Sequence, residues 1–253
     1  MSPSAQPDAG TDRIQRLRTH AREAIARPEA NPECLLAGSR SWMRTGNEPS
    51  HILRRGILAG DILRSLTPVI DRDELIVGKY SWRPLTAQED AELQLFNTYG
   101  EPARSKDMGI RAHMAVDYER LLRMGIVGIR EQIDAYRGRL DPSRPEDQEK
   151  DFFYRGCLAA LDGMIEMARR YAGIATRMAE EEEDPERKAE LAEIARICRK
   201  VPEQPAGTFW EALQSVHFVT WCLCAGNQTT LFQLGRPDRL LWPYFAEDQG
   251  PAS

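Results

Sequence analysis

Apolar side chains recur every three or four residues through most of the chain, which is the spacing of one face of an α-helix. Such a face must be covered by other elements, so the chain is predicted to fold as an assembly of packed helices. The stripes cover residues 14–25, 52–63, 93–99, 118–136, 161–178, 191–198 and 213–223. At 253 residues the chain is long enough to bury a full hydrophobic core.

Residues that typically cap helices stand before several of these stripes. They are Thr11, Ser50, Thr86, Asp184 and Thr208. Thr86 and Thr208 each begin a Thr-x-x-Glu capping box, with Glu89 and Glu211 respectively. The aspartate is followed by a proline suited to a first helical turn. These signals predict helix starts close to each of the five residues.

The stripe over residues 213–223 differs from the others because it is apolar on most of its sides. A helix of this kind belongs in the interior of a large protein. The run LLWPYF, which begins at Leu240, is also strongly apolar. We therefore expect residues 216–225 and this run to form an exposed apolar patch when the chain stands alone.

Two stretches have the composition of β-strands: residues 74–77, followed by Gly78, and more weakly residues 229–234. The predicted fold class is therefore mainly α-helical with a few short strands. Residues 1–10 consist of small and polar types without periodicity, which predicts a disordered tail. Residues 11–253 contain no obvious linker and are interpreted as one unit.

Charge and cysteine usage exclude several classes of protein. The 34 Lys and Arg residues against 39 Asp and Glu residues give a net charge of −5, so nucleic acid and anionic membranes are not expected partners. The five cysteines form no Cys-x-x-Cys pair, which argues against a disulfide framework and favours a reducing cytoplasm. The start of the chain lacks a secretory signal, and residues 216–225 are too few to cross a bilayer.

The sequence has none of the common signatures of phosphate loops, zinc proteases or α/β-hydrolases. His217, Cys222 and Cys224 are close enough in sequence to suggest a metal site. A Cys-x-Cys pair on a helix directs its thiols to different faces, however, so core cysteines are the preferred interpretation. The acidic run 180–183 would splay around a helix and is predicted to be solvated. No catalytic, cofactor-binding or metal-binding residue is assigned.

His113 is a further candidate for a functional side chain. It stands four residues before Asp117 and the long stripe that follows. From the residues alone, a hydrogen-bonded structural histidine is favoured over one that binds a substrate, and both interpretations stay open.

Three longer stretches resemble the N-terminal part of glycyl radical enzymes of the pyruvate formate-lyase type, in the glycerol and diol dehydratase-like branch. The first is DRDELIVGKYSWRPLT from Asp71, and the second is AHMAVDYERLLRMGIVGI from Ala112. The third begins at Asp184, includes TFWEALQ, and continues to LGRPDRLLWPYFAED from Leu234. The resemblance covers nearly the whole chain after the tail.

The resemblance implies a large α/β barrel wrapped in helices, of which this chain would be the N-terminal portion. In that family a glycyl radical takes a hydrogen atom from a cysteine, and the thiyl radical then takes one from a small-molecule substrate. An S-adenosylmethionine-dependent iron–sulfur activating enzyme installs the radical, and full-length members are expected to be homodimers. No segment here resembles the cysteine or glycyl loop, so none of the five cysteines is assigned the thiyl role.

The resemblance also implies one substrate-binding residue. Relatives that act on hydroxylated substrates use the histidine of a Gly-His-x-x-x-Asp-Tyr segment to hydrogen-bond a substrate hydroxyl, and here that residue is His113. Ala112 replaces the glycine of this segment. Residues 227–233, NQTTLFQ, stand where relatives often have an Asn-Gly-His-Ser-like run, and the hydroxyls of Thr229 and Thr230 could replace the serine.

The leading hypothesis is an N-terminal fragment of a glycyl radical lyase or dehydratase that cleaves a C–O or C–X bond in a small hydroxylated or similar polar substrate. Such a fragment is expected to be inactive without the remaining C-terminal part of the enzyme. One alternative is a non-enzymatic helical scaffold or interaction protein derived from the same fold. A second is a formate C-acetyltransferase or decarboxylase of the same family.

Overall fold

The computed structural model describes residues 9–26, 31–99, 114–227 and 232–250. The described part is mainly helical with two short strands, as predicted. The helices are α1 (Ala9–Ile25), α2 (Pro32–Arg44), α3 (His51–Ser65), α4 (Ala87–Tyr99), α5 (Tyr118–Arg137), α6 (Pro145–Glu181), α7 (Pro185–Lys200), α8 (Phe209–Asn227) and α9 (Pro237–Asp248). The strands are β1 (Met114–Ala115) and β2 (Phe232–Gln233), which pair in parallel. Within these ranges no helix combines the length and the apolar character that crossing a membrane requires.

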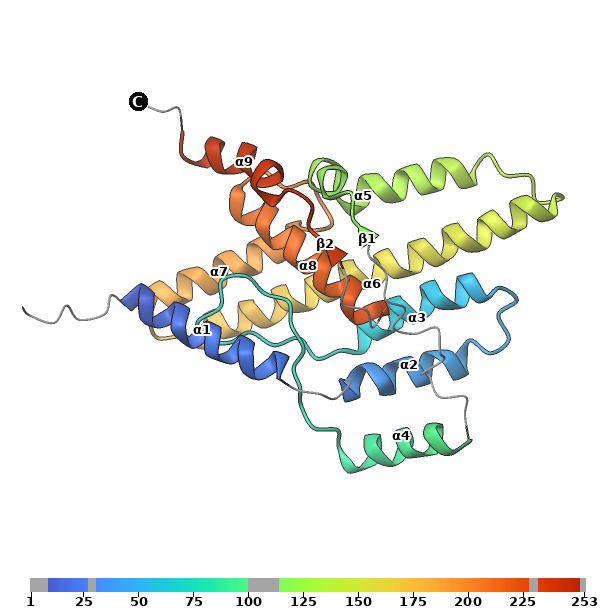
Figure 1. Cartoon of the computed structure of the whole chain (residues 1–253), viewed down its shortest axis with the longest axis horizontal. Helices are drawn as coiled ribbons and strands as arrows, with labels where there is room; N and C mark the ends of the chain where they lie inside the picture. Colours follow the sequence, from blue (N-terminus) through green and yellow to red (C-terminus); the bar gives the residue numbers. More distant parts are fainter. Residues whose placement is uncertain (1–8, 27–30, 100–113, 228–231, 251–253) are drawn as a thin grey trace, which may run out of the picture.

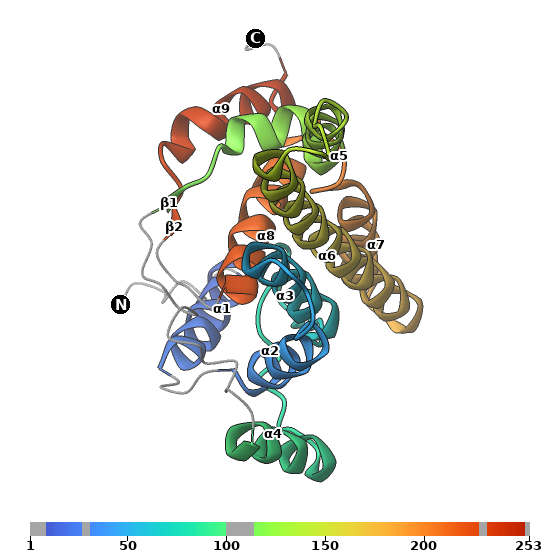
Figure 2. The same cartoon turned by 90° about the vertical axis from the view of Figure 1, so that its right-hand side faces the viewer.

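Helix α6 is the central element of the fold, and α3 and α7 pack against it (Figure 1). In Figure 2, α3, α2 and α4 follow one another away from α8, while α5 and α9 lie toward the opposite end. Proline begins α6 in its first turn, and no further proline interrupts its 37 residues. The helix is therefore long enough to contact α3, α5, α7 and α8 along its length.

Helices α3 and α6 approach each other through glycines. A Cβ atom on Gly56 would lie 2.2 Å from the carbonyl oxygen of Gly156, and one on Gly163 would lie 2.6 Å from the Cα atom of Gly60. Real Cβ atoms do not approach backbone atoms so closely, so the absence of a side chain at these positions allows the two helices to pack backbone to backbone.

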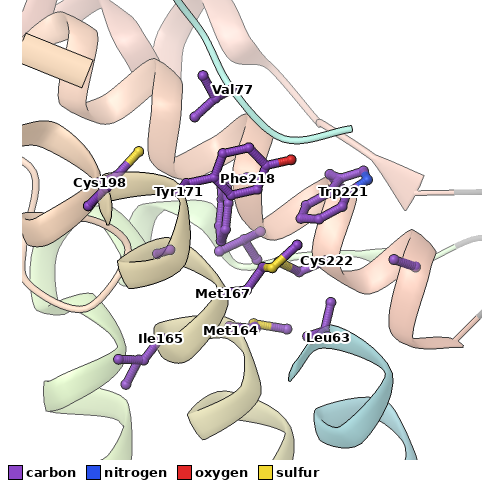
Figure 3. Close-up of a cluster of buried hydrophobic side chains, with 14 of the residues drawn as sticks. Leu63, Val77, Met164, Ile165, Met167, Tyr171, Cys198, Phe218, Trp221 and Cys222 are labelled. Carbon is purple, nitrogen blue, oxygen red and sulfur yellow. The ribbon is translucent and has the colours of Figure 1, made fainter. Parts of the chain in front are cut away.

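The centre of the core is a cluster of aromatic side chains from α6 and α8 (Figure 3). The ring of Tyr171 is fully buried and meets the rings of Phe218 and Trp221 edge to face, at centroid distances of 5.7 and 5.9 Å. These geometries are favourable because the positive edge of one ring faces the negative face of the other. The cluster joins the two helices at the point where they cross.

Helix α8 is buried within this chain, which corrects the expectation that residues 216–225 form an exposed patch. Its residues Val216, Phe218 and Cys222 are at most 4% exposed, because α3, α5, α6 and α7 surround it. The apolar run in α9 is exposed as expected: α9 has no buried residue, and the side chain of Trp242 is 63% exposed. The apolar character of α8 therefore serves the core of this chain itself.

Residues 74–77 do not form the predicted strand. Side chains, rather than a neighbouring strand, hydrogen-bond to the backbone of this segment. The amide of Gln214 pairs with both backbone groups of Val77, accepting from the N–H at 2.9 Å and donating to the carbonyl oxygen at 2.7 Å. Arg187 donates to the carbonyl oxygen of Glu74 at 2.9 Å. The β-propensity of the segment is real, but α7 and α8 supply the hydrogen bonds.

Most of the predicted helix starts are confirmed. Ser50 and Asp184 accept from backbone N–H groups in the first turns of α3 and α7. The Thr86 capping box is complete, because Glu89 also accepts from the backbone N–H of Thr86 at 2.9 Å. Thr11 lies inside α1, which begins at Ala9, so the prediction that it caps this helix is wrong. The predicted tail covered residues 1–10. Ala9 and Gly10 belong to α1, and residues 1–8 lie outside the described residues.

The stripe over residues 118–136 forms a helix with a kink that the periodicity does not show. Gly125 has φ of 63°, in the left-handed region that favours glycine. After the kink, Ile126 and Val127 donate their backbone N–H groups to the carbonyl oxygens of Pro202 and Glu203, both at 2.9 Å. The connection between α7 and α8 thus takes hydrogen bonds that α5 would otherwise make. Helices α2 and α9 were not among the predicted elements.

Candidate functional site

The β1–β2 pair joins two parts of the chain that the sequence analysis marked as candidate substrate-binding segments. The strands are parallel, with Met114 opposite Phe232 and Ala115 opposite Gln233. Met114 directly follows His113, and Phe232 directly follows the 228–231 part of the second segment. His113, Ala112, Thr229 and Thr230 lie outside the described residues. The strands that adjoin them are therefore the described part of the candidate site.

The segment after β1 is attached to α8 by a pair of hydroxyl groups. The phenolic oxygen of Tyr118 lies 2.5 Å from Oγ1 of Thr220, and Tyr118 is 3% exposed. Thr220 donates its hydroxyl proton to the carbonyl oxygen of Val216 at 2.7 Å, so Tyr118 is the donor to Thr220. Asp117 caps α5 by accepting from the backbone N–H of Arg120 at 3.0 Å. These bonds hold the start of α5 against α8.

The DRDELIVG stretch also lies along α8. Its residue Val77 lies beside Tyr171 and Phe218 of the aromatic cluster (Figure 3). The hydroxyl of Tyr171 donates to the carbonyl oxygen of Lys79 at 3.1 Å and accepts from its N–H at 3.2 Å. Burial raises the pKa of Tyr171, which keeps the hydroxyl protonated for both bonds. Hydrogen bonds from the core therefore hold this stretch in place.

His217 belongs to the contacts between α8 and the DRDELIVG stretch, and not to a metal site. Its Nε2 atom lies 2.9 Å from the carbonyl oxygen of Gly78. Cys222 is buried in the core and Cys224 is half-buried, which agrees with the preferred interpretation of these residues as core cysteines. No group of three His, Cys, Asp or Glu side chains within the described ranges is placed to hold a metal ion. The acidic residues 180–183 are largely exposed, as predicted.

A cavity of about 450 Å³ lies between α1 and residues 69–82. Polar side chains line it, including His20, the carboxylates of Asp71 and Glu74, and the ammonium of Lys79. The ammonium of Lys79 forms ion pairs with Asp71 and with Glu74, the latter at 2.7 Å. Burial raises the pKa of Glu74, although the hydrogen bond from Lys79 opposes this shift. The sequence analysis did not identify this cluster: Asp71, Glu74 and Lys79 stand in one quoted stretch, but only the fold places His20 of α1 beside them.

The comparison with models of protein families decides to which family the chain belongs. A sequence model described as pyruvate formate lyase-like matches residues 103–250, which is more than half of the chain. The chain belongs to the pyruvate formate lyase-like family. The match includes β1, β2 and the helices α5 to α9, so the two candidate substrate-binding segments lie within the region that defines the family.

Curated relatives of this pyruvate formate lyase-like chain include lyases and dehydratases of small polar molecules. The isethionate sulfite-lyase of Oleidesulfovibrio alaskensis is 32% identical over 183 residues, covering 66% of this chain and 22% of the relative. The (2S)-3-sulfopropanediol dehydratase of Klebsiella oxytoca is 35% identical over 136 residues, covering 54% of this chain and 16% of the relative. The chain thus spans a small share of the length of these relatives.

Solved structures share the fold. The glycerol-bound B12-independent glycerol dehydratase of Clostridium butyricum aligns with a TM-score of 0.82 at 23% identity, over 99% of this chain and 38% of that one. A glycyl radical enzyme of Archaeoglobus fulgidus aligns with a TM-score of 0.78 at 26% identity, over 94% and 37% of the two chains. The pyruvate formate lyase-like chain therefore has the architecture of about a third of a glycyl radical enzyme.

The cysteines of this pyruvate formate lyase-like chain are placed as packing residues. Burial raises the pKa of Cys34 and of Cys198 to about 12 and raises that of Cys222 well above its usual value. Cys157 and Cys224 are half-buried, and burial raises their pKa values as well. These thiols are protonated at neutral pH, and none stands in β1, β2 or the residues that pair with them. The five cysteines therefore do not fit the role of a reacting cysteine in the candidate site beside β1 and β2.

Proposed function

We propose that the chain forms the N-terminal portion of a glycyl radical lyase or dehydratase that cleaves a C–O or C–X bond in a small hydroxylated substrate. In this proposal, residues next to β1 and β2 form one side of the substrate pocket. His113 donates or accepts the hydrogen bond that orients a substrate hydroxyl. The radical glycine and the thiyl cysteine belong to other parts of the enzyme and supply the hydrogen-atom transfers.

The β1–β2 pairing is the observation that supports this proposal. The strands are far apart in sequence, yet Met114 and Phe232 are opposite each other in a parallel pair. β1 lies within the first of the two segments that resemble substrate-binding segments of glycyl radical enzymes, directly after His113, and β2 lies at the end of the second. Parallel strands run in the same direction, so the residues that directly precede β1 and β2 would lie at the same end of the pair. The pairing would bring substrate contacts from both segments to one side of a pocket.

The exposed face of α9 supports the proposal that further polypeptide of the enzyme packs against this chain. Phe209, Leu241, Trp242 and Phe245 line a shallow hollow of about 350 Å³ at this face. Contiguous exposed apolar clusters commonly mark interaction surfaces. The solved relatives are almost three times as long as the aligned part, since the aligned region covers 36–38% of them. We propose that the remaining polypeptide of the enzyme covers α9.

The test uses the full-length enzyme that contains this sequence, activated in the absence of oxygen. His113→Ala is expected to lower turnover at least tenfold, because a buried substrate hydroxyl then loses its partner. The glycyl radical signal in electron paramagnetic resonance should be unchanged, since the radical forms on another segment. Product formation and the radical signal are measured on the same sample.

His51→Ala serves as the matched control, because this histidine is exposed and lies at the start of α3, outside β1 and β2. It should retain both turnover and the radical signal. Loss of the radical together with turnover in His113→Ala would show that His113 has a structural role. Unchanged turnover in that variant would contradict the proposed substrate contact.

A further inference from the structure

A second cavity, of about 420 Å³, lies between α5, α6 and α8. It is separate from the charged cavity beside α1 and shares no lining residue with it. Its wall is predominantly apolar. Representative lining residues are Leu121, Ile129 and Ile133 from α5, Leu161 and Met164 from α6, and Val219 from α8. A space of this volume and composition is typical of a small-molecule site.

The wall of this cavity also carries a cation that pairs with none of the residues that the structure describes. The side chain of Arg120 lines the cavity and is half-buried. Its guanidinium makes no hydrogen bond or ion pair with any residue that the structure describes. Asp117 lines the same cavity and accepts from the backbone N–H of Arg120, but no ion pair joins its carboxylate to the guanidinium. The guanidinium therefore has no bound anion among the described residues.

An unused acceptor lies further along the same wall. Gln132 lines the cavity, and its Oε1 atom is buried without a hydrogen-bond partner in the described part of the chain. Among the described residues, its amide nitrogen donates only to the sulfur of Met124, at 3.5 Å. Buried polar atoms are normally hydrogen-bonded, so the side chain of Gln132 is incompletely satisfied within the described part of the chain.

We propose that this cavity binds a small amphipathic carboxylate, with its apolar chain inside and its carboxylate on Arg120. An arginine next to apolar surface suits this ligand, because its planar guanidinium matches a carboxylate and is weakly hydrated. The apolar wall favours ligands with longer alkyl chains, since each buried methylene strengthens binding by roughly fourfold. The cavity adjoins the start of α5 directly after β1, since Val116 and Asp117 line it, but the proposal does not depend on His113.

Isothermal titration of the 253-residue chain with octanoate tests the proposal, with hexanoate and 1-octanol as comparison ligands. Octanoate should bind more tightly than hexanoate by roughly fifteenfold, because it buries two more methylenes. Arg120→Gln should weaken octanoate binding by about tenfold or more and leave 1-octanol binding unchanged, because only the carboxylate loses its charged partner. Octanoate should also slow the reaction of Cys157, a lining residue, with a thiol reagent.

Arg123→Gln is the matched control, since Arg123 lies on the same helix, is exposed and does not line the cavity. It should leave octanoate binding unchanged. Failure of octanoate to bind at millimolar concentration would overturn the proposal, as would equal binding by the Arg120→Gln variant. The titration is repeated with the full-length enzyme. Loss of octanoate binding there would show that another part of the polypeptide occupies the cavity, and this also overturns the proposal.

Discussion

The carboxylate of Glu211 lies 2.6 Å from the ammonium of Lys200, although Glu211 is only 1% exposed. Arg196 donates to the other carboxylate oxygen at 2.8 Å, and the backbone N–H of Gly207 donates at 2.7 Å. Three donors from α7 and the following loop therefore meet one buried carboxylate at the start of α8. This cluster joins the two helices where residues 202–203 also hydrogen-bond to α5.

Replacement of this carboxylate should destabilise the fold. Glu211→Gln keeps the shape of the side chain but removes the charge that Lys200 and Arg196 contact, and we expect the free energy of unfolding to fall by about 1–3 kcal/mol. Urea denaturation followed by circular dichroism measures the change. Glu183→Gln, in the exposed acidic run, is the control and should change stability by less than about 0.5 kcal/mol.

The same cluster predicts how stability depends on pH. Burial tends to raise the pKa of Glu211, but the hydrogen bonds from Lys200, Gly207 and Arg196 outweigh it, so the pKa in the folded chain lies below the ordinary value of 4.5. The carboxylate of Glu211 therefore binds a proton more weakly in the folded chain than in the unfolded chain. Its contribution to stability is fully present above the pKa of the unfolded state, and it is lost as the pH falls through the pKa of the folded state. The stability gap between wild type and Glu211→Gln should therefore be smaller at about pH 4 than at about pH 7.

The hydroxyl pair between α5 and α8 should contribute measurably. Tyr118→Phe removes the donor to Thr220 without opening a cavity, and we expect a loss of about 1 kcal/mol in the free energy of unfolding. Tyr136→Phe makes the same chemical change at a residue that is 49% exposed, and it should have little effect. Equal effects of the two substitutions in thermal denaturation would contradict the role of this hydrogen bond.

The glycine contact between α3 and α6 should not tolerate a methyl group. Gly56→Ala would place a Cβ atom 2.2 Å from the carbonyl oxygen of Gly156, so the helices must separate. We expect destabilisation of about 2 kcal/mol or more. Gly173 is in α6, and a Cβ atom added to it would meet nothing within 4 Å, so Gly173→Ala should instead stabilise the helix by up to about 1 kcal/mol. Differential scanning calorimetry compares the two melting temperatures.

The exposed face of α9 should bind a hydrophobic dye when the chain is isolated. Trp242 is 63% exposed, and Phe245 packs against Phe209 at a ring distance of 5.4 Å. Trp242→Gln should reduce the fluorescence of bound dye, whereas Leu95→Gln, at an exposed residue of α4, should not. A chain that binds no dye and unfolds cooperatively as a monomer would contradict the need for a covering partner.

The sequence by itself determined the positions of most helices, because the signals for a helix are local. Ser50, Thr86 and Asp184 cap backbone N–H groups within the next few residues, so their role can be recognised without knowledge of the fold. The resemblance to glycyl radical enzymes was likewise carried by contiguous stretches, and the family match confirmed it. Helix α9 escaped prediction because its apolar residues do not follow one clear stripe, and an internal proline interrupts its pattern.

Tertiary structure decided the features in which distant residues compete for the same backbone groups. Gly125 kinks α5 because the carbonyl oxygens of Pro202 and Glu203 accept N–H groups that would otherwise continue the helix. Residues 74–77 are not a strand because Gln214 takes the hydrogen bonds that a neighbouring strand would make. The pairing of β1 with β2 likewise depends on α5 and α8 being packed side by side. Local sequence preferences cannot show such contacts, because their free energy exists only once the helices have assembled.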